Sequence, residues 1–481
     1  MKKAIYLIIT MALLVALASP GSFAKAQSAT ATSWTSSITY YTPSDTSGSL
    51  TIKYYDGPTS YTAGPLALSP NKAGSLFIGS TEVPEGFAGS AVLSADVPIV
   101  ATYVQLAAGS EVNNYGRMMY NAFKPGNAGS TFYVPTVLNQ TAGFTSRVGV
   151  QNIESFKITA TLKFFEVGET TPTVQTNRDI DPFASYVFSP GDVGLPTPFN
   201  GSMVVTAVKQ GDPGTNALVV ASSEETQDSG RGAYAFEGTA SAANKVYMPS
   251  MLSAYQTAEG EFTSYYAIQA SGGQAQVRIK YYDTAGNLLK NTPQFTINDG
   301  SKESHNPVGD GVASNKIGSA VIESTGAPIM VIAKIVGDNG VRTAFPGEAV
   351  GSKKVAAPYI RWSADAFANW RSYVAVMNVD TVNATSIIAR YYDANGNKVG
   401  EENLTNAAHG GPLPPSIKRN TSPASANALD GNGDFGILGG AVEIESDANI
   451  LVVVRVQKNV SGLEPTTLFA EDYNGVDVST P

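Results

Sequence analysis

Lys280-Tyr281-Tyr282-Asp283 is one copy of a short phrase that this chain uses four times. The other copies are Lys53-Tyr54-Tyr55-Asp56, Lys163-Phe164-Phe165-Glu166 and Arg390-Tyr391-Tyr392-Asp393. In chain order the copies lie 110, 117 and 110 residues apart. This interval is longer than the ~20–50 residues of a solenoid unit and matches a small domain. The chain is therefore predicted to be a tandem array of four domains, each with its own core.

Three further features keep the same spacing. An aromatic-x-Ser step precedes each phrase, starting at Trp34, Phe144, Phe262 and Trp370. A step of small residues follows it, starting at Gly89, Gly201, Gly318 and Gly439. A phenylalanine closes each unit, at Phe123, Phe236, Phe345 and Phe469. These features predict repeat 1 over residues 27–126, repeat 2 over 127–240, repeat 3 over 241–350 and repeat 4 over 351–481.

The secondary structure of one repeat follows from its hydrophobic periodicity. Residues 276–281 alternate polar and apolar side chains, which is typical of a strand with one buried face. Asn395-Gly396 is a strong hairpin signal, and residues 450–454 form a continuous apolar run typical of a central strand. No window carries a helical stripe. The sequence thus predicts an all-β protein of four tandem antiparallel β-sandwich domains, in which the first ring of each phrase enters the core and its acidic residue starts a turn.

The first 26 residues have the composition of a secretory signal peptide. Lys2 and Lys3 precede an apolar run over residues 5–18, and Ala24-Lys25-Ala26 forms a small-x-small cleavage site. We expect a cleaved leader over residues 1–26 and a mature protein that is secreted, extracellular or attached to a bacterial cell surface. Its removal takes three lysines and no acid, which moves the net charge from −9 to −12. This acidity argues against a nucleic-acid partner, and no second apolar segment is long enough to span a membrane.

Residue composition also argues against catalysis. The chain has no cysteine, which excludes a lipid-anchored cysteine, disulfides and thiol chemistry. Its only two histidines, His305 and His409, lie in different repeats within polar stretches. No catalytic triad, multi-histidine zinc site or distinct pair of carboxylates is indicated. We therefore expect no enzyme activity, no catalytic residues and no organic cofactor.

One short stretch has the spacing of a metal loop. Asp430, Asn432 and Asp434 match the first three oxygen ligands of a calcium-binding loop and are the candidate metal ligands. The match ends there, because Phe435 stands where such a loop needs Gly and Ala441 where it needs Glu. The alternative is a turn that leads into the following strand.

The order of apolar phrases in repeat 3 resembles a known β-sandwich. The phrases are Val246-Tyr247-Met248-Pro249, residues 262–269, residues 277–283, residues 318–324 and Pro328-Ile329-Met330-Val331. They are similar to the small β-sandwich of the sensory rhodopsin transducer family, and to tandem repeats of exported bacterial surface proteins. The resemblance covers one repeat at a time and implies the fold. It transfers no functional residue, and a membrane photoreceptor partner does not suit a secreted four-repeat chain.

These observations predict a non-enzymatic structural or adhesive protein of the cell surface or extracellular matrix. Its expected partners are other surface or matrix proteins or a second copy of itself. The alternative is an array of carbohydrate-binding modules, because 23 Tyr and three Trp could stack on sugars. Trp34 and Trp370 are in register with Phe144 and Phe262, which favours core positions, so only Trp362 lies outside the repeated features.

The two ends of the array predict a way to assemble. Repeats 2, 3 and 4 each begin with an extra strand that carries a proline, at Pro135, Pro249 and Pro358, and repeat 1 has no such strand. Counted from Phe469, Pro481 falls at the position of these prolines. The C-terminal segment could therefore complete repeat 1 of the next molecule and give head-to-tail polymers. The alternatives are a local cover from residues 28–33 and a frayed tail.

Overall fold

The computed structural model describes residues 33–108, 116–227, 232–363, 369–435, 439–460 and 467–479. Within these ranges every paired strand is antiparallel and the only helices are four 3₁₀ turns, so the prediction of an all-β protein is confirmed. The turns are η1 (Ile78–Ser80), η2 (Pro125–Asn127), η3 (Pro190–Val193) and η4 (Ala407–His409). The predicted leader, residues 1–26, lies outside the described residues.

The first two repeats each form two facing sheets. Repeat 1 contains β1 (Ser33–Tyr41), β2 (Gly48–Asp56), β3 (Thr59–Leu68), β4 (Ala73–Phe77), β5 (Ser90–Ala95), β6 (Val100–Ala108) and β7 (Arg117–Asn121). Repeat 2 contains β8 (Thr131–Asn139), β9 (Phe144–Asn152), β10 (Ile158–Glu166), β11 (Val174–Ile180), β12 (Ser185–Phe188), β13 (Phe199–Lys209), β14 (Asp212–Asn216), β15 (Val219–Gln227) and β16 (Ala233–Glu237). The sheet orders are β4-β1-β6-β7 and β3-β2-β5 in repeat 1, and β12-β9-β15-β16 and β11-β10-β13-β14, with β8 on β13, in repeat 2.

The last two repeats follow the same plan. Repeat 3 contains β17 (Lys245–Ser253), β18 (Tyr255–Thr257), β19 (Gly260–Ala270), β20 (Ala275–Asp283), β21 (Leu288–Asn291), β22 (Phe295–Ile297), β23 (Lys302–His305), β24 (Lys316–Gly326), β25 (Ile329–Gly337) and β26 (Arg342–Pro346). Repeat 4 contains β27 (Ser352–Ile360), β28 (Asn369–Asn378), β29 (Ile387–Asp393), β30 (Lys398–Asn403), β31 (Lys418–Thr421), β32 (Gly440–Val460), β33 (Thr467–Asn474) and β34 (Val476–Asp477). The 21-residue β32 takes part in both halves of repeat 4, so its strands form one eight-stranded sheet.

The repeated phrase has the structural role that its sequence predicts. Its first ring is fully buried in every repeat, in β2, β10, β20 and β29 (Tyr54, Phe164, Tyr281 and Tyr391). The acidic residue closes the next turn in repeat 3, where Asp283 Oδ1 accepts hydrogen bonds from the backbone N–H of Ala285 (3.0 Å) and Asn287 (2.8 Å). Asp393 makes the same two bonds in repeat 4. The phrase therefore marks a buried core position and a hairpin turn of the sandwich rather than a ligand site.

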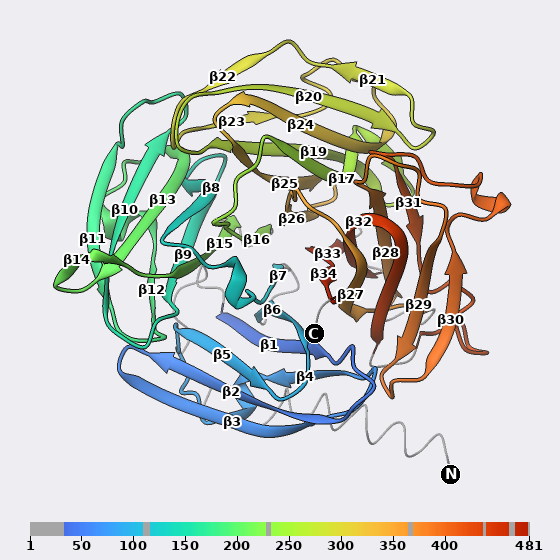
Figure 1. Ribbon diagram of the computed structural model, residues 1–481, viewed down its shortest axis with the longest axis horizontal. Coiled ribbons are helices and arrows are strands. Elements are labelled where there is room, and N and C mark those ends of the chain that lie inside the picture. Colours follow the sequence, from blue (N-terminus) through green and yellow to red (C-terminus); the bar gives the residue numbers. More distant parts are fainter. Residues whose placement is uncertain are drawn as a thin grey trace.

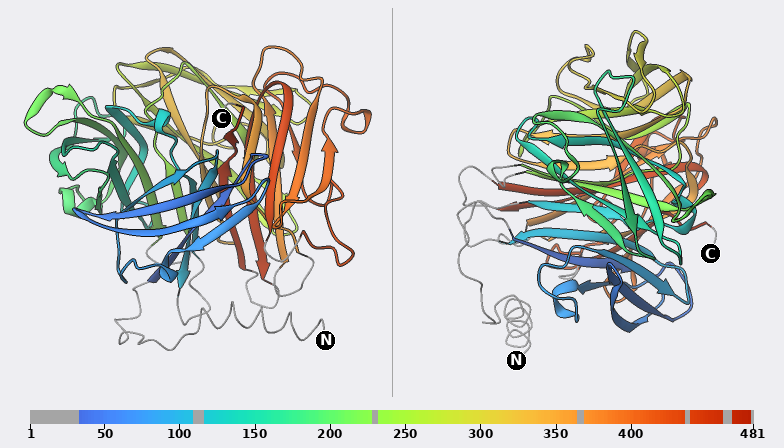
Figure 2. Two further views of the ribbon diagram at one scale, coloured as in Figure 1. Left: turned by 60° about the horizontal axis from the view of Figure 1, so that its bottom comes forward. Right: turned by 90° about the vertical axis from the view of Figure 1, so that its left-hand side faces the viewer.

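The four repeats stand around a central axis and close into a ring (Figures 1 and 2). The innermost strands β7, β16, β26 and β33 each contact the next, and β33 contacts β7. Repeat 4 meets repeat 1 through a buried ion pair between Arg117 and Glu471 and through a 2.9 Å hydrogen bond from Tyr41 Oη to Glu443. Residues more than 350 positions apart thus hold the ring closed.

Ring closure brings residues of one repeat into the core of its neighbour, contrary to the expectation that each repeat owns its core. The core of repeat 2 includes Ile332 and Ala344 of repeat 3. The core of repeat 4 includes Val104 and Met119 of repeat 1. The physical reason is that the two strands nearest the axis, β6 and β7 in repeat 1 and β25 and β26 in repeat 3, lie against the neighbouring repeat, so their apolar side chains pack against it.

Strand pairing corrects the closing residue of two repeats. Tyr120, Phe236, Phe345 and Tyr473 occupy the same register position, opposite Tyr103, Ser223, Ala333 and Val454. Phe236 and Phe345 are fully buried, as expected. Phe123 lies three residues after this position and Phe469 four residues before it, so both were the wrong markers. A tyrosine takes the place of phenylalanine in repeats 1 and 4.

This correction changes the interpretation of the C-terminal segment. Val476 lies three residues after Tyr473, as Thr239 and Glu348 lie three residues after Phe236 and Phe345. All three residues pair with the first strand of their own repeat. The strand β34 is therefore already held on β27 of the same chain. The spacing that matched Pro481 to a donated strand was an effect of counting from Phe469.

Candidate functional site: the open junction between repeats 1 and 2

The first strands of repeats 2, 3 and 4 have neighbours on both edges. We call β8, β17 and β27 the junction strands. On one edge they pair with β13, β24 and β32, respectively. On the other edge they pair with the chain that follows the closing residue, as Tyr133 N–H does with Thr239 O (2.9 Å) and Thr239 N–H with Tyr133 O (3.0 Å). Each junction strand is thus held by a row of backbone hydrogen bonds on one edge and by a bridge of one or two residues on the other.

The junction strands are also buried on both faces. Phe132 and Val134 of β8 lie fully buried in the core of repeat 2. On the opposite face, Tyr247 of β17 packs against Met377 and Leu451 of repeat 4. In the same way β8 contacts β19 and β25 of repeat 3, and β27 contacts β1 and β6 of repeat 1. A junction strand therefore fills the space between its own repeat and the next one around the ring.

The junction between repeats 1 and 2 has no such strand among the described residues, and a cavity of about 870 Å³ lies there. One rim of this cavity is the edge of β5, residues 89–93, and the other is the chain after the closing residue, residues 122–125. Its wall is the interior of repeat 1, including Ile38 and Tyr54, and its floor is the sheet of β9, β12 and β15 in repeat 2. We call this cavity the open junction. Its volume is in the range of ligand-binding sites.

The strand β5 has no neighbour on its outer edge among the strands that the structure describes, and its burial differs accordingly. Ala91, Val92 and Leu93 occupy the register positions of Met203, Val204 and Val205 in β13. The three β5 residues are only half-buried, whereas Met203 and Val205 are fully buried. The apolar edge of repeat 1 therefore still has surface to bury.

The floor of the open junction carries an opposite pair of charges. Burial raises the pKa of Glu224, and the positive charge of Arg147 acts in the other direction. Tyr103 and Tyr120 lie beside them with ring centroids 5.0 Å apart, and Tyr103 Oη lies 2.8 Å from Ser36 Oγ. Trp34 completes this aromatic side of the cavity. The site therefore combines an apolar wall with a few polar groups on one face.

The equivalent positions in the filled junction between repeats 2 and 3 are tied together. Lys334 occupies the register position of Glu224 and forms a 2.5 Å ion pair with the fully buried Glu225. Thr136 of the junction strand β8 donates a 3.1 Å hydrogen bond to Glu225. Burial, together with the nearby charge of Lys334, lowers the pKa of the neighbouring Lys302 to about 7. A filled junction is therefore a closed polar network, whereas the open junction is a cavity.

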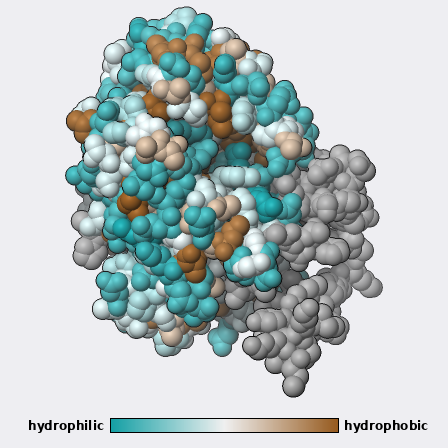
Figure 3. All heavy atoms as spheres, turned by 90° about the vertical axis from the view of Figure 1, so that its right-hand side faces the viewer, coloured by the Kyte–Doolittle hydropathy of each residue, from teal (hydrophilic) through white to brown (hydrophobic). Residues whose placement is uncertain are grey.

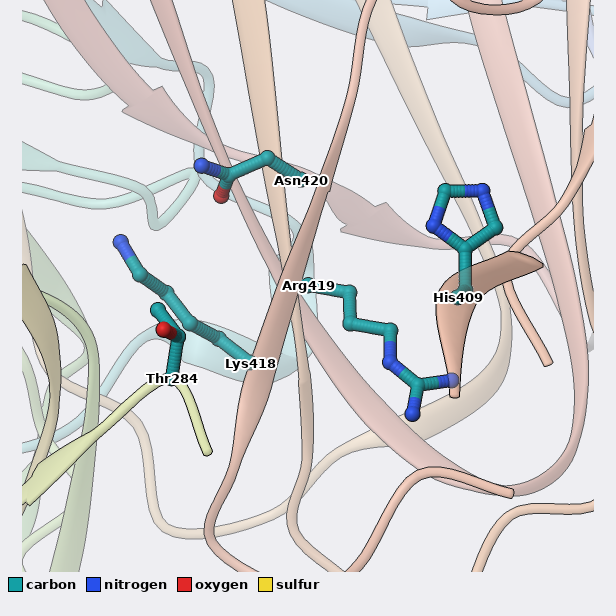
Figure 4. A pocket seen from close by; sticks show the side chains of 5 residues that line it. All are labelled: Thr284, His409, Lys418, Arg419 and Asn420. Carbon is teal, nitrogen blue, oxygen red and sulfur yellow. The ribbon is translucent and has the colours of Figure 1, made fainter. Parts of the chain in front are cut away.

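A smaller cavity of about 230 Å³ lies between repeats 3 and 4 (Figure 4). It is lined by Thr284, His409, Lys418, Arg419 and Asn420. Burial lowers the pKa of Lys418 to about 7, and Arg419 donates hydrogen bonds to the carbonyl oxygens of Leu404 and Gly411. Arg419 is thus engaged with the protein, and the space is small for an organic ligand.

The two histidines are held in separate places. His305 Nδ1 lies 2.8 Å from Asp310, and the ring stacks on Phe295 at 4.0 Å. His409 Nε2 lies 2.9 Å from Glu402. Neither belongs to the open junction. In the described part of the chain, no group of three or more His, Asp or Glu side chains has a metal-binding arrangement.

The candidate calcium residues form a turn that closes on itself. Asp430 Oδ1 accepts hydrogen bonds from the backbone N–H of Asn432 (2.9 Å) and Asp434 (3.0 Å). These bonds, led by the one from Asp434, hold the pKa of Asp430 below its usual value. The Asp430 carboxylate thus already has backbone partners in the structure. Calcium binding at Asp430, Asn432 and Asp434 stays a prediction.

The three tryptophans have different surroundings. Trp34 lines the open junction. Trp370 is buried between the guanidinium groups of Arg117 and Arg361, at 4.8 and 5.0 Å from its ring centre. Trp362 packs edge-on against Tyr373. Of the three, Trp34 is therefore the one at the open junction. Sequence reasoning did not single out Arg147 and Glu224, because their role depends on the neighbouring repeat, but the lack of a first strand in repeat 1 was a usable signal.

Figure 3 shows the hydropathy of one outer face of the ring. That face, which carries repeat 4, is mostly hydrophilic, with apolar side chains in small separate groups. None of the helices in the described ranges is long and apolar enough to cross a bilayer.

No protein-family model matches the sequence, and no curated protein matches it either. The open junction therefore has to be interpreted from its own chemistry.

Proposed function

We propose that this chain is an exported, non-enzymatic structural or adhesive protein of the cell surface or extracellular matrix. In this proposal residues 1–26 are a cleaved leader, and four β-sandwich domains follow, as in the exported tandem-repeat proteins that the repeats resemble. The ring is the rigid body, and the open junction between repeats 1 and 2 is where it holds a partner. The observation that carries the proposal is the 870 Å³ cavity at one of four otherwise equivalent junctions.

The chemistry of the open junction supports binding rather than turnover. Its titratable pair, Arg147 and Glu224, comes with no histidine, and the two histidines of the chain lie in repeats 3 and 4. The half-buried β5 edge supplies apolar area for a partner to cover, at about 25 cal/mol per Å². The ring that surrounds the cavity is fixed by buried ion pairs on both sides, which preorganises the site.

Export and attachment can be tested together in a bacterial host. The full chain, produced with its own leader, should lose residues 1–26 and appear at the surface or in the medium, as shown by N-terminal sequencing and fractionation. A Leu93→Pro variant, which blocks the β5 edge, should be exported equally well but attach less to a matrix or cell surface than the Leu93→Ala variant. Retention in the cytoplasm, or equal attachment by both variants, would contradict the proposal.

A carbohydrate ligand is the second candidate function, and one observation favours it. Trp34, Tyr103 and Tyr120 together line the open junction, and aromatic rings beside a carboxylate and a guanidinium suit stacking on a sugar. A polysaccharide array would test this alternative. Micromolar binding to one glycan, lost on Trp34→Ala, would support it over a polypeptide partner.

A further inference from the structure

Three of the four junctions provide a template for what the fourth accepts. The junction strands β8, β17 and β27 each span nine residues and run antiparallel to the strand beside them. Their side chains are apolar toward their own core, as at Val246 and Met248, and also toward the next repeat, as at Tyr247. An occupant of an equivalent site is therefore extended and apolar on both faces.

The hydrogen-bonding direction of the template identifies the free groups on the rims. Tyr133 exchanges both of its backbone hydrogen bonds with Thr239, so the backbone groups of its neighbours Phe132 and Val134 point to the other edge, toward β13. Their partners there, Val205 and Met203, correspond to Leu93 and Ala91 of repeat 1. The backbone groups of Leu93 and Ala91 therefore face the open junction.

The second rim repeats this arrangement. Phe123 lies three residues after Tyr120, which is the position of Thr239 relative to Phe236, and it lines the cavity. A strand placed in the open junction would thus meet β5 on one edge and the backbone at Phe123 on the other. The backbone groups of Ala91 and Leu93 on β5 have the spacing of a strand, and the backbone at Phe123 adds one bridge position on the opposite edge. This arrangement favours a polypeptide, because a sugar lacks the matching repeat.

We propose that the open junction binds an extended apolar segment of a partner polypeptide, which adds as the missing junction strand antiparallel to β5. This inference rests on the proposed function and names the chemical class of its ligand. The partner is a different chain, because β8, β17 and β27, together with β34, are already paired within the described part of this one. Within the described ranges, a second folded copy has no equivalent strand to donate without breaking its own junction.

The chain supplies its own probe for this inference. A fluorescent peptide with the sequence of residues 245–253 should bind the chain that begins at Gln27, with micromolar affinity in fluorescence anisotropy, and a scrambled peptide should not. N-methylation of the Met248 amide, which faces the β5 edge in this pairing, should weaken binding at least tenfold. N-methylation of Lys245, whose amide faces away from β5, is the matched control and should have little effect.

Two protein variants test the same edge from the other side. Leu93→Pro removes the backbone N–H that faces the cavity, and Leu93→Ala removes the side chain but keeps this N–H. Binding should be lost in the first variant and reduced less than tenfold in the second. If the proline variant does not fold by circular dichroism, the methylated peptides on the wild-type chain decide alone. Absence of peptide binding, or equal binding of the Met248- and Lys245-methylated peptides, overturns the inference.

Other occupants give distinct outcomes. One such outcome is that sedimentation shows dimers that dissociate when the peptide is added. That result would assign the site to a second copy of this chain and overturn the proposal of a different partner chain. Peptide binding to the chain from Gln27 but not to the chain from Met1 would assign it to the chain's own N-terminal segment. Glycan binding without peptide binding would overturn the inference and leave the second candidate function. Peptide binding with unchanged attachment of the Leu93 variants would support the inference and contradict the proposed function.

Discussion

Two junctions of the ring have the same architecture but differ in what fills them. One lies between repeats 2 and 3, and the other between repeats 1 and 2. In the first, β8 fills the gap, and Thr136, Glu225, Lys302 and Lys334 form a closed network. In the second, the corresponding space is a cavity whose charged pair, Arg147 and Glu224, faces it. The difference teaches that one strand per repeat does two tasks, since it completes a sandwich and also seals the ring. Where the described residues of repeat 1 lack this strand, a cavity is present and the fold is unchanged.

The largest expected contrast is in the closing residue. Phe236→Ala should destabilise the protein by about 3–5 kcal/mol, because it removes a fully buried ring. The matched change in repeat 1, Tyr120→Ala, should cost about 1–2 kcal/mol, because this ring is half-buried beside the open junction. Chemical denaturation of both variants measures the difference. Equal losses would mean that the open junction is as well packed as a filled one.

Phe236 also tests how far the ring behaves as one body. Its core includes Ile332 and Ala344 of repeat 3, so the loss should move the main unfolding transition rather than split off one repeat. Differential scanning calorimetry distinguishes the two outcomes. A separate early transition, with the remainder unmoved, would restore the view of four independent cores.

The next contrast concerns adjacent glutamates. Glu225→Gln should cost about 1.5–3 kcal/mol, because it weakens the charged hydrogen bonds to Lys334 and Thr136 in a fully buried site. Glu224→Gln, one residue away on the open junction, should be neutral or slightly stabilising, since burial disfavours its charge. Urea midpoints of the two variants compare the junctions directly. A larger loss for Glu224 would indicate that Arg147 compensates its burial fully.

The sequence predicted much of this fold because its repeats report local structure. The Tyr-Tyr-Asp phrase marked a buried ring and a turn, and both are found at Tyr281 and Asp283. It could not predict the ring, because closure depends on pairs such as Arg117 and Glu471 whose sequence separation carries no periodic signal. The register error at Phe123 and Phe469 has a similar cause. In both repeats a nearby Phe fitted the sequence pattern, whereas the residue at the closing position is a Tyr that only strand pairing identifies.

Two glutamates, Glu237 and Glu348, predict a smaller effect, in which the stability of the protein depends on pH. Burial raises the pKa of both Glu237 and Glu348 to about 7. A carboxyl with a raised folded-state pKa stabilises the protein fully below about pH 4, and this stabilisation is lost as the pH rises through about 7. Double substitution to Gln should flatten the stability profile over this interval. An unchanged slope would show that these carboxyls are solvated.

Lys302 provides the opposite sign at the filled junction. Its folded-state pKa, lowered by burial to about 7, means that its stabilising contribution is present above about pH 10 and is lost as the pH falls through 7. Lys302→Met should therefore remove a rise in stability between about pH 7 and 10 and leave the acidic limb unchanged. Ser185 occupies the equivalent position at the open junction, so Ser185→Ala is the control without a titrating group.

The smallest expected effect lies far from both junctions, in the turn at Asp430. Asp430→Ala removes two hydrogen bonds that an exposed carboxylate accepts from backbone N–H groups, and it should cost about 1 kcal/mol. If the turn alone accounts for this residue, calcium should leave the melting temperature of the wild-type chain unchanged. If Asp430, Asn432 and Asp434 bind calcium, the ion should raise the wild-type melting temperature and have no effect on Asp430→Ala. Asp393→Ala is the matched control, because Asp393 makes the same two backbone bonds in a turn without the calcium-like spacing. A calcium shift that both variants lose would place the ion elsewhere and reduce the Asp430 turn to a local structural feature.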